Sequence, residues 1–441
     1  MHTPSLHLLG TPQSRSLTYA YAGAHFGKSL FWYASEILFA YFLTEVGQIP
    51  VRYMGLILAV GYFSGTAADL GLGLLLRQRL SHVLQACRLQ CLGAVLGALT
   101  LVLLFLCTYV PPAWRAPYAL LMGIAFRVAY ALYDLPQNAL LSLATKDADS
   151  RSRVSSLRIF FSGTASLLIA SAIAPLLTSR IATGQPARFL LLVLGLSLAA
   201  ILSALALLRA MRKAGPLPEL PSTPALRPGL RQSLRGLPPC VWIVVAMLVL
   251  IAGGCAMFLK LEPYYIAYVL KSPGWGTSIA MMASLGAILS QFLWRYLLLQ
   301  PGRSRVDCLL LATVGLLVSI TGFWLGTHDW LVIMACALGF GVFSGGCGTV
   351  LWAAFGDLVA DSVKADAGLA YGLMTGAVKI ALGVNCLVLG QLLSGIDYRG
   401  SQSGQLPGLM CGPLMLACLL VMLLAWLWTR MGRPARYQRY Q

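Results

Sequence analysis

Residues 239–270 read PCVWIVVAMLVLIAGGCAMFLKLEPYYIAYVL. The part from Pro239 to Leu259 has no charged residue, and its length matches the roughly 20 apolar residues that cross a bilayer as an α-helix. Similar runs recur along the 441-residue chain, which is 58% hydrophobic and only 10% charged. A soluble domain carries about 25% charged residues. Composition therefore predicts an all-α membrane protein and disfavours a soluble fold.

Twelve membrane spans are predicted in two groups of six, separated by a polar, proline-rich stretch. The expected spans are 19–43, 53–76, 86–110, 117–144, 154–178, 186–210, 239–270, 275–299, 306–326, 329–356, 367–394 and 407–430. The expected domains are thus an N-terminal six-helix bundle at 1–210, a cytoplasmic linker at 211–238 and a C-terminal six-helix bundle at 239–441. This division is typical of transporters made of two repeated halves, with a solute site near the midplane.

The distribution of positive charge predicts the orientation. Of the 32 lysines and arginines, five lie within predicted spans, six lie in loops on one side, and the other 21 lie on the opposite side. Since cytoplasmic loops carry the excess of Lys and Arg, both termini are expected in the cytoplasm of a multi-pass protein of the inner (plasma) membrane. The basic residues are scattered over short loops, which argues against a nucleic-acid partner.

The sequence contains few candidates for catalytic residues or metal ligands. The eleven cysteines lie mostly within spans, and no cluster of Cys and His offers a metal set. Four of the five histidines lie at the chain end or in loops, and His25 lies near the start of the first predicted span, all away from any plausible nucleophile. We therefore expect no enzyme activity, no metal and no cofactor. The expected partners are a small-molecule substrate and the lipid bilayer, and the protein is expected to be a monomer.

Charged residues inside predicted spans are the strongest indication of function. A charge at the bilayer centre costs about 2.5–3.5 kcal/mol, so such residues are usually functional or paired. Four acids and five bases belong to this group: Lys28, Glu36, Asp69, Arg127, Asp134, Arg158, Lys260, Glu262 and Lys379. Their near balance indicates a cavity in which acids and bases pair when the site is empty.

Several of these charges also have a structural interpretation. Lys28 and Arg158 lie near the inner ends of their spans and could extend their charged groups to the interface. Arg127 precedes Asp134 by seven residues, hence on the same helix face, so a purely structural pair is an alternative. Asp69 lies mid-span among glycines, and Lys379 lies mid-span among small residues, which favours function for both.

Short motifs in both halves resemble the glycoside–pentoside–hexuronide:cation symporters, the melibiose-permease family of the major facilitator superfamily. In the first half these motifs are YAGAHFGKSLFWY at 21–33, YFLTEVG at 41–47, DLGLG at 69–73, YDLPQNAL at 133–140, DSRSR at 149–153 and RIFF at 158–161. In the second half they are GDLVADSV at 356–363 and the pair Val378-Lys379. The resemblance implies the major facilitator fold and cation-coupled transport.

The resemblance also implies roles for individual residues. Asp69 matches a helix II carboxylate that shares the coupling cation, and Lys379 matches a lysine near the cation and sugar sites. Asp134 and Arg158 match residues that contact the sugar. Two positions are assigned to gates, Lys28 on the first helix and Asp357 in the second half.

Departures from the family pattern change the expected coupling ion. The family's second helix II carboxylate is Gly65 here, its helix IV hydroxyl is Ala131, and its stacking aromatic is Asn138, which we keep with the substrate site. A sodium site needs several oxygen ligands, and two of the expected ones are missing. One carboxylate (Asp69) beside a lysine is better suited to a proton, so H+ is the expected coupling ion and Na+ the less expected one.

Charges beyond the family pattern indicate a charged substrate. Glu36, Arg127, Lys260 and Glu262 are additional and are assigned to substrate binding, and Pro263 is expected to break the seventh span beside the last two. We therefore expect proton-coupled symport of a small polar, charged or zwitterionic solute. The alternatives are a proton-driven exporter of a siderophore or other secondary metabolite, a cation-coupled sugar symporter, and a membrane receptor or scaffold that transports nothing.

Overall fold

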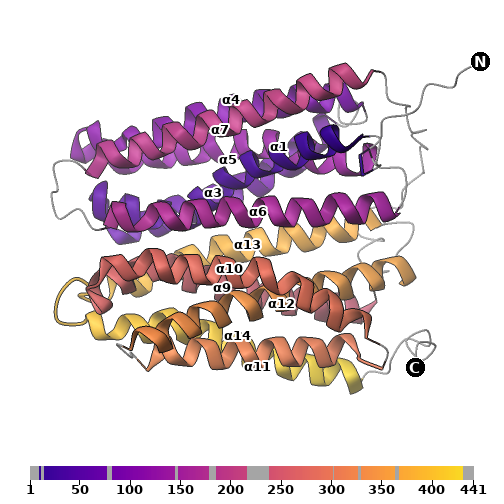
Figure 1. Cartoon of the computed structure of the whole chain (residues 1–441). Helices are drawn as coiled ribbons and strands as arrows, with labels where there is room; N and C mark the ends of the chain where they lie inside the picture. Colours follow the sequence, from indigo (N-terminus) through magenta and orange to yellow (C-terminus); the bar gives the residue numbers. More distant parts are fainter. Residues whose placement is uncertain are drawn as a thin grey trace, which may run out of the picture. The chain divides into compact units, whose positions relative to one another are not determined.

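The structure is a computed structural model. It describes residues 9–10, 14–76, 82–144, 148–177, 185–215, 238–300, 302–325, 329–362 and 367–430. The chain divides into two compact units, unit 1 (residues 1–224) and unit 2 (residues 225–441). This boundary falls within the predicted linker, whose residues 216–237 lie outside the described part. Each unit is a bundle of long helices (Figure 1).

Unit 1 begins with a long segment that is α-helical at first and π-helical in two places. The helices of this unit are α1 (Arg15–Tyr33), η2 (Ala34–Leu38), α2 (Phe39–Tyr41), η3 (Phe42–Val46), α3 (Val51–Leu75), α4 (Val83–Phe105) with η5 (Leu106–Tyr109), α5 (Pro112–Leu143), α6 (Ala148–Leu177) and α7 (Gln185–Ala214). Wide π turns are uncommon and occur mostly at functional sites. Here η2 carries Glu36.

Unit 2 repeats this plan. Its helices are α9 (Pro239–Tyr265) with η7 (Ile266–Leu270), α10 (Pro273–Leu299), α11 (Arg305–Trp324), α12 (Trp330–Ser362), α13 (Ala367–Ser394), η9 (Ser403–Gln405) and α14 (Leu406–Arg430). Local sequence explains several starts. Pro239 and Pro273 occupy first-turn positions, where the missing N–H costs nothing. Ser304 and Asp307 form a capping box at the start of α11.

Ten of the described helical segments are long and apolar enough to cross a membrane. The α1–η3 segment and α6 are not among them, because both carry several charged and hydroxyl side chains; α6 has a shorter apolar stretch, Leu157–Ala172. The all-helical membrane class is confirmed, whereas twelve spans and cytoplasmic termini stay predictions. Helices α5, α6 and α12 extend beyond the predicted spans, since helical backbone continues past the apolar stretch.

The predicted helix break at Pro263 is wrong. Helix α9 continues through Pro263 to Tyr265 and then widens into η7. Proline removes one backbone hydrogen bond and crowds the preceding turn, and a wider turn beside it can absorb this distortion without interrupting the helix. Most side chains of the stretch are buried, so tertiary packing also favours the continuous helix.

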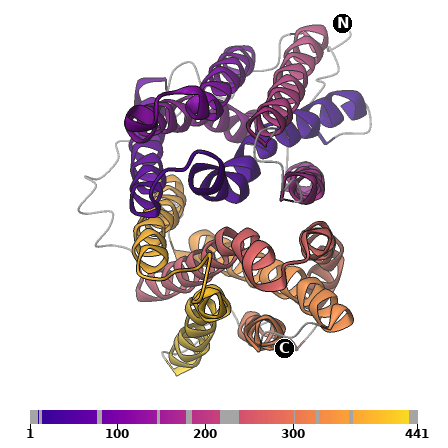
Figure 2. The ribbon, with the colours of Figure 1, turned by 90° about the vertical axis from the view of Figure 1, so that its left-hand side faces the viewer.

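The same helix pairs carry the main contacts within each unit. In unit 1, α4 packs on α5 and α7, α3 packs on α5, and α1 packs on α6 and α7. In unit 2 the corresponding helices by chain order do the same: α11 packs on α12 and α14, α10 packs on α12, and α9 packs on α13 and α14. Figure 2 views these bundles closer to end-on. The units thus share one internal packing plan, although no residue-by-residue repeat is evident.

Close backbone approach holds α10 against α12. A Cβ on Gly341 of α12 would overlap the carbonyl oxygen of Ala283, and a Cβ on Gly286 of α10 would overlap the carbonyl oxygen of Leu338. Small residues allow such contact in membrane bundles, where van der Waals packing replaces the hydrophobic effect. Nearby, Trp294 Nε1 donates to the carbonyl of Val342 at 2.8 Å.

Gly341→Ala is expected to lower the stability of unit 2 by about 1–3 kcal/mol, the usual cost of overpacking. Gly348→Ala in the same helix is the matched control, because a Cβ there meets no atom within 4 Å. Thermal unfolding of the purified variants in detergent measures the difference. Equal melting temperatures for the two variants would show that α10 and α12 are not in backbone contact.

Candidate solute and coupling site

Lys28 and Asp134 form a short ion pair in unit 1. Lys28 Nζ of α1 lies 2.6 Å from Asp134 Oδ1 of α5, and the side chains are only 11% and 16% exposed. The alternative that Lys28 reaches the interface is therefore wrong, since its charge is neutralised inside the unit. Asp134, assigned to substrate, and Lys28, assigned to a gate, belong to one contact.

Glu36, Tyr62 and Arg127 form a second buried cluster. Arg127 Nη2 of α5 lies 3.4 Å from Glu36 Oε1, and the Tyr62 hydroxyl of α3 donates to the same oxygen. The guanidinium carbon of Arg127 lies 4.2 Å from the centre of the Tyr62 ring and 5.7 Å from that of Trp32. Arg127 and Asp134 thus each pair with an opposite charge on the first helical segment. The alternative of a structural pair between Arg127 and Asp134 did not include these partners.

Two glycines make room for Arg127. Cβ atoms built on Gly61 and Gly65 of α3 would each lie 3.5 Å from the Arg127 side chain. The guanidinium-bearing chain therefore runs along the glycine face of α3. Gly65 is the position where the melibiose-permease pattern has its second carboxylate, and in this chain that position borders an arginine.

Arg158 and Asn138 are also brought together. Arg158 Nη2 of α6 lies 2.6 Å from Asn138 Oδ1 of α5. At the preceding residue of α5, Gln137, α1 and α5 are joined by a reciprocal pair: the Tyr21 hydroxyl donates to the carbonyl of Gln137 at 2.8 Å, and Gln137 Nε2 donates to the carbonyl of Tyr21 at 3.1 Å. These bonds fix the helix register that places Lys28 opposite Asp134.

Tyr130 lies among these charged groups. It lies within electrostatic range of Asp134, Arg127 and Asp69, and its ring centre lies 5.9 Å from that of Trp32. Asp69 itself is half-buried on α3. Side chains from α1, η2, α3, α5 and α6 therefore supply seven of the predicted site residues, which include two ion pairs and one side-chain hydrogen bond and are called the unit 1 network. These are Lys28, Glu36, Asp69, Arg127, Asp134, Asn138 and Arg158.

Unit 2 holds the other four predicted residues, and they are spread over three helices. Lys260 and Glu262 of α9 are 2% and 5% exposed, Lys379 of α13 is half-buried, and Asp357 of α12 pairs with Arg305 of α11 at 3.1 Å. The Asp357 side chain is 41% exposed, so solvent weakens this pair. Within the described residues no ion pair joins Glu262 to Lys260, in agreement with their placement on different helix faces.

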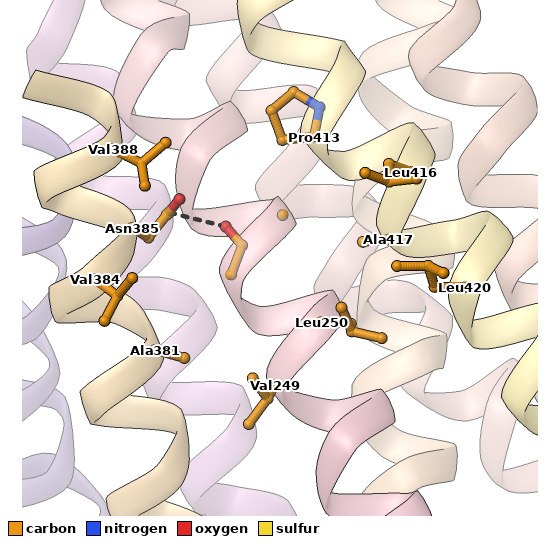
Figure 3. A pocket seen from close by; sticks show the side chains of 12 residues that line it. Val249, Leu250, Ala381, Val384, Asn385, Val388, Pro413, Leu416, Ala417 and Leu420 are labelled. Atoms are coloured by element: carbon orange, nitrogen blue, oxygen red, sulfur yellow. Dashed lines mark hydrogen bonds between the residues drawn. The ribbon is translucent and has the colours of Figure 1, made fainter. Parts of the chain in front are cut away.

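A groove between α9, α13 and α14 is apolar. Its volume is about 350 Å³, and Asn385 supplies its main polar group by donating to the carbonyl of Gly253 at 3.0 Å (Figure 3). Val384, Val388 and Leu416 line it and are strongly exposed. None of the predicted site residues lines this groove, and its surface suits hydrocarbon better than a charged solute.

Sequence reasoning missed the aromatic residues beside the unit 1 network. Trp32 lies one turn before Glu36, and Tyr130 lies between Arg127 and Asp134 on the same face of α5, so helical spacing could have indicated both. Nothing local distinguished Tyr62, because its partners come from other helices. Among the described residues, no three His, Cys, Asp or Glu side chains gather as a metal-ligand set.

The comparisons with known proteins agree with this architecture. The family model described as MFS/sugar transport protein matches residues 20–431. A solved D-xylose–proton symporter superposes with a TM-score of 0.66 at 15% identity, over 92% of this chain and 96% of that chain. The xylose transporter XylE from E. coli, in an inward-open conformation, superposes with a TM-score of 0.64 at 13% identity, over 93% and 95%. No curated protein matches the chain in sequence.

The chain belongs to the MFS/sugar transport protein family, because the family model covers nearly all of it. The recognised resemblance to the melibiose-permease family is confirmed, and the protein is a membrane transporter and not an enzyme. The likeness to the xylose transporters, at such low identity, shows the major facilitator fold alone.

A double-mutant cycle tests the Lys28–Asp134 contact. Lys28→Met and Asp134→Asn are each expected to cost about 3–5 kcal/mol, because either change leaves a buried charge without its partner. The double variant is expected to cost less than the sum of the two. Melting temperatures of purified protein in detergent give the comparison.

The more exposed Arg305–Asp357 pair provides the matched control for this cycle. Its single variants Arg305→Gln and Asp357→Asn are expected to cost no more than about 1 kcal/mol. Additive losses at Lys28 and Asp134 would contradict a direct interaction between them.

Proposed function

We propose that this protein is a secondary active transporter that moves a small polar, charged organic solute by alternating access, coupled to proton symport. The observation that carries the proposal is the unit 1 network, in which Lys28, Arg127 and Arg158 each bind an oxygen of another side chain. Two of these bases, Lys28 and Arg127, are buried, and bases held by replaceable oxygens suit a site that exchanges internal partners for a solute. A bundle that only had to pack would avoid their desolvation cost.

Arg127 is the best candidate to recognise a substrate carboxylate. Its Nη2 lies 3.4 Å from Glu36 Oε1, a longer contact than the 2.6 Å between Lys28 and Asp134. Guanidinium groups bind carboxylates through two parallel hydrogen bonds, which are stronger than one long contact. A solute carboxylate could therefore replace Glu36 at Arg127. Lys260, the buried base of α9, is proposed to contribute a second positive group from unit 2.

The coupling ion is proposed to be a proton carried by Asp69, with Lys379 as its basic counterpart. Gly65 and Ala131 stand where the family offers further oxygen ligands, so a sodium ion would lack part of its usual shell. The Glu36 carboxylate becomes a second proton acceptor when a solute displaces it from Arg127. Proton uptake would then accompany the binding of an anion.

The membrane arrangement is also part of the proposal. The apolar runs support twelve spans, and the charge asymmetry supports a cytoplasmic linker at 211–238 and two cytoplasmic termini. We place the protein as a monomer in the inner (plasma) membrane. Asp357, in its pair with Arg305, is proposed as a gate residue, and so is Lys28.

Cation-coupled sugar transport is the second candidate. The two solved structures described above are xylose transporters by name, and Trp32 and Tyr130 offer the aromatic surface that Asn138 does not. Proton-driven export uses the same residues, because direction depends on gradients and on the energies of the two states. Reconstituted transport with reversed gradients separates import from export.

Asp69→Asn is expected to abolish uphill solute accumulation in proteoliposomes under a proton gradient, while solute exchange without a gradient continues. The reason is that an amide cannot bind and release the coupled proton. Unchanged uphill accumulation by the variant would exclude Asp69 as the coupling group. Asp397→Asn, in an exposed loop of unit 2, is the control and should accumulate solute normally.

Arg127→Gln is expected to weaken binding of an anionic ligand about tenfold to a hundredfold, the value of a charged hydrogen bond, with a much smaller loss for its neutral analogue. Lys260→Gln should act in the same direction. Glucuronate and glucose form a suitable pair, since they differ by one carboxylate, and tryptophan fluorescence or calorimetry measures their affinities. The exposed Arg52→Gln is the control. Equal losses for both ligands would argue against charge recognition.

A further inference from the structure

Glu262 is a buried carboxyl group that the unit 1 network does not use. It lies on α9, is 5% exposed, and its Oε1 has no hydrogen-bond partner among the described residues. The next residue is Pro263, and the π-helical segment η7 begins at Ile266, four residues after Glu262. Distorted helix geometry beside a buried acid is typical of functional positions in membrane transporters.

The surroundings of Glu262 are aromatic. Phe258 and Tyr265 lie one turn before and one turn after it, on the same helix face. The Phe258 ring stacks on Phe340 of α12 with centres 4.3 Å apart, and it meets Phe323 of α11 edge-on at 5.2 Å. Tyr265 meets the same Phe323 ring at 6.0 Å. This face of α9 is therefore directed into the core of unit 2.

The titratable groups near this face are neutral ones. The Tyr265 hydroxyl is buried and has no hydrogen-bond partner in the described part of the chain. The titratable side chains that act electrostatically on that hydroxyl are the thiols of Cys411 on α14 and Cys336 on α12. The nearest base in sequence, Lys260, projects from a different face of the helix. The described residues thus include no cation bound to Glu262.

An ionised carboxylate in such a place is expensive, whereas a protonated carboxyl is not. The protonated carboxyl of Glu262 also has an O–H group that can donate a hydrogen bond. The carbonyl of Leu259, one turn before Glu262, is a nearby acceptor, because Pro263 has no N–H to donate to it. A metal cation would need several oxygen ligands, and this face offers one carboxyl and one hydroxyl.

We propose that Glu262 is a proton-binding site in the core of unit 2, separate from Asp69 and not part of the solute site. The inference replaces the sequence-based assignment of Glu262 to substrate. The inference adds a second proton site to the proposed proton symport, and a role for this proton in transport rests on that proposed function. Occupancy of Glu262 by a proton is independent of that use and is measured without any solute.

Infrared difference spectroscopy of the purified full-length protein tests the site. The spectrum of the wild type minus that of Glu262→Gln, at neutral pH in lipid nanodiscs, is expected to contain the carbonyl band of a protonated carboxyl group. The same difference with Glu45→Gln, a half-buried glutamate near the end of η3, is the control and should lack that band. Raising the pH is expected to remove the band from the wild type.

Further outcomes keep the test decisive. If Glu262→Gln does not fold, Glu262→Asp serves instead, and the expected result is a shifted carboxyl band. Absence of a protonated band in the wild type, or an identical band in the Glu262 variants, would overturn the proposal. Loss of the band on replacing choline chloride by sodium chloride at constant pH would show a cation site and overturn it too. A positive spectrum with normal uphill transport by Asp69→Asn would refute only the proposed coupling residue.

Discussion

The cost of holding a charge away from water is the constraint on which this molecule depends. In unit 1 this cost is reduced because basic side chains of some helices pair with carboxylate oxygens of other helices. Lys28 reaches Asp134, and Arg127 reaches Glu36 with an added hydroxyl from Tyr62. Each contact joins helices that are distant in sequence. The charges that make insertion expensive therefore also define how the helices of this unit must be arranged around them.

The two units show how strongly helix packing can be preserved without visible sequence repetition. Both use the same pairs of helices in the same chain order. In lipid, the requirement at a helix contact is close approach of small residues, as at Gly286 and Gly341, and many sequences satisfy it. Both units also place π-helical turns towards the end of their first helical segment, beside a buried acid. The two units share a packing plan but carry different charges. Unit 1 holds paired acids and bases, whereas in unit 2 Glu262 Oε1 has no hydrogen-bond partner among the described residues.

The departures from the melibiose-permease pattern have a physical explanation in the structure. A Cβ on Gly65, at the position of a family carboxylate, would lie in van der Waals range of the Arg127 side chain. Loss of the aromatic at position 138 leaves Asn138 to accept from Arg158, while Trp32 and Tyr130 provide aromatic surface from other positions. Positions 65 and 138, which both depart from the family pattern, thus each lie beside an arginine.

The sequence by itself determined the membrane class, most helix positions and the family, because apolar length and short motifs are local properties. It also identified the buried charges, since any charge within an apolar run is conspicuous. Only the tertiary structure decided the partners: Glu36 for Arg127, Asp134 for Lys28, and none among the described residues for Glu262 Oε1. It likewise decided that α9 continues through Pro263. These features depend on which helices meet, and a spacing rule within one helix cannot report contacts between helices far apart in the chain.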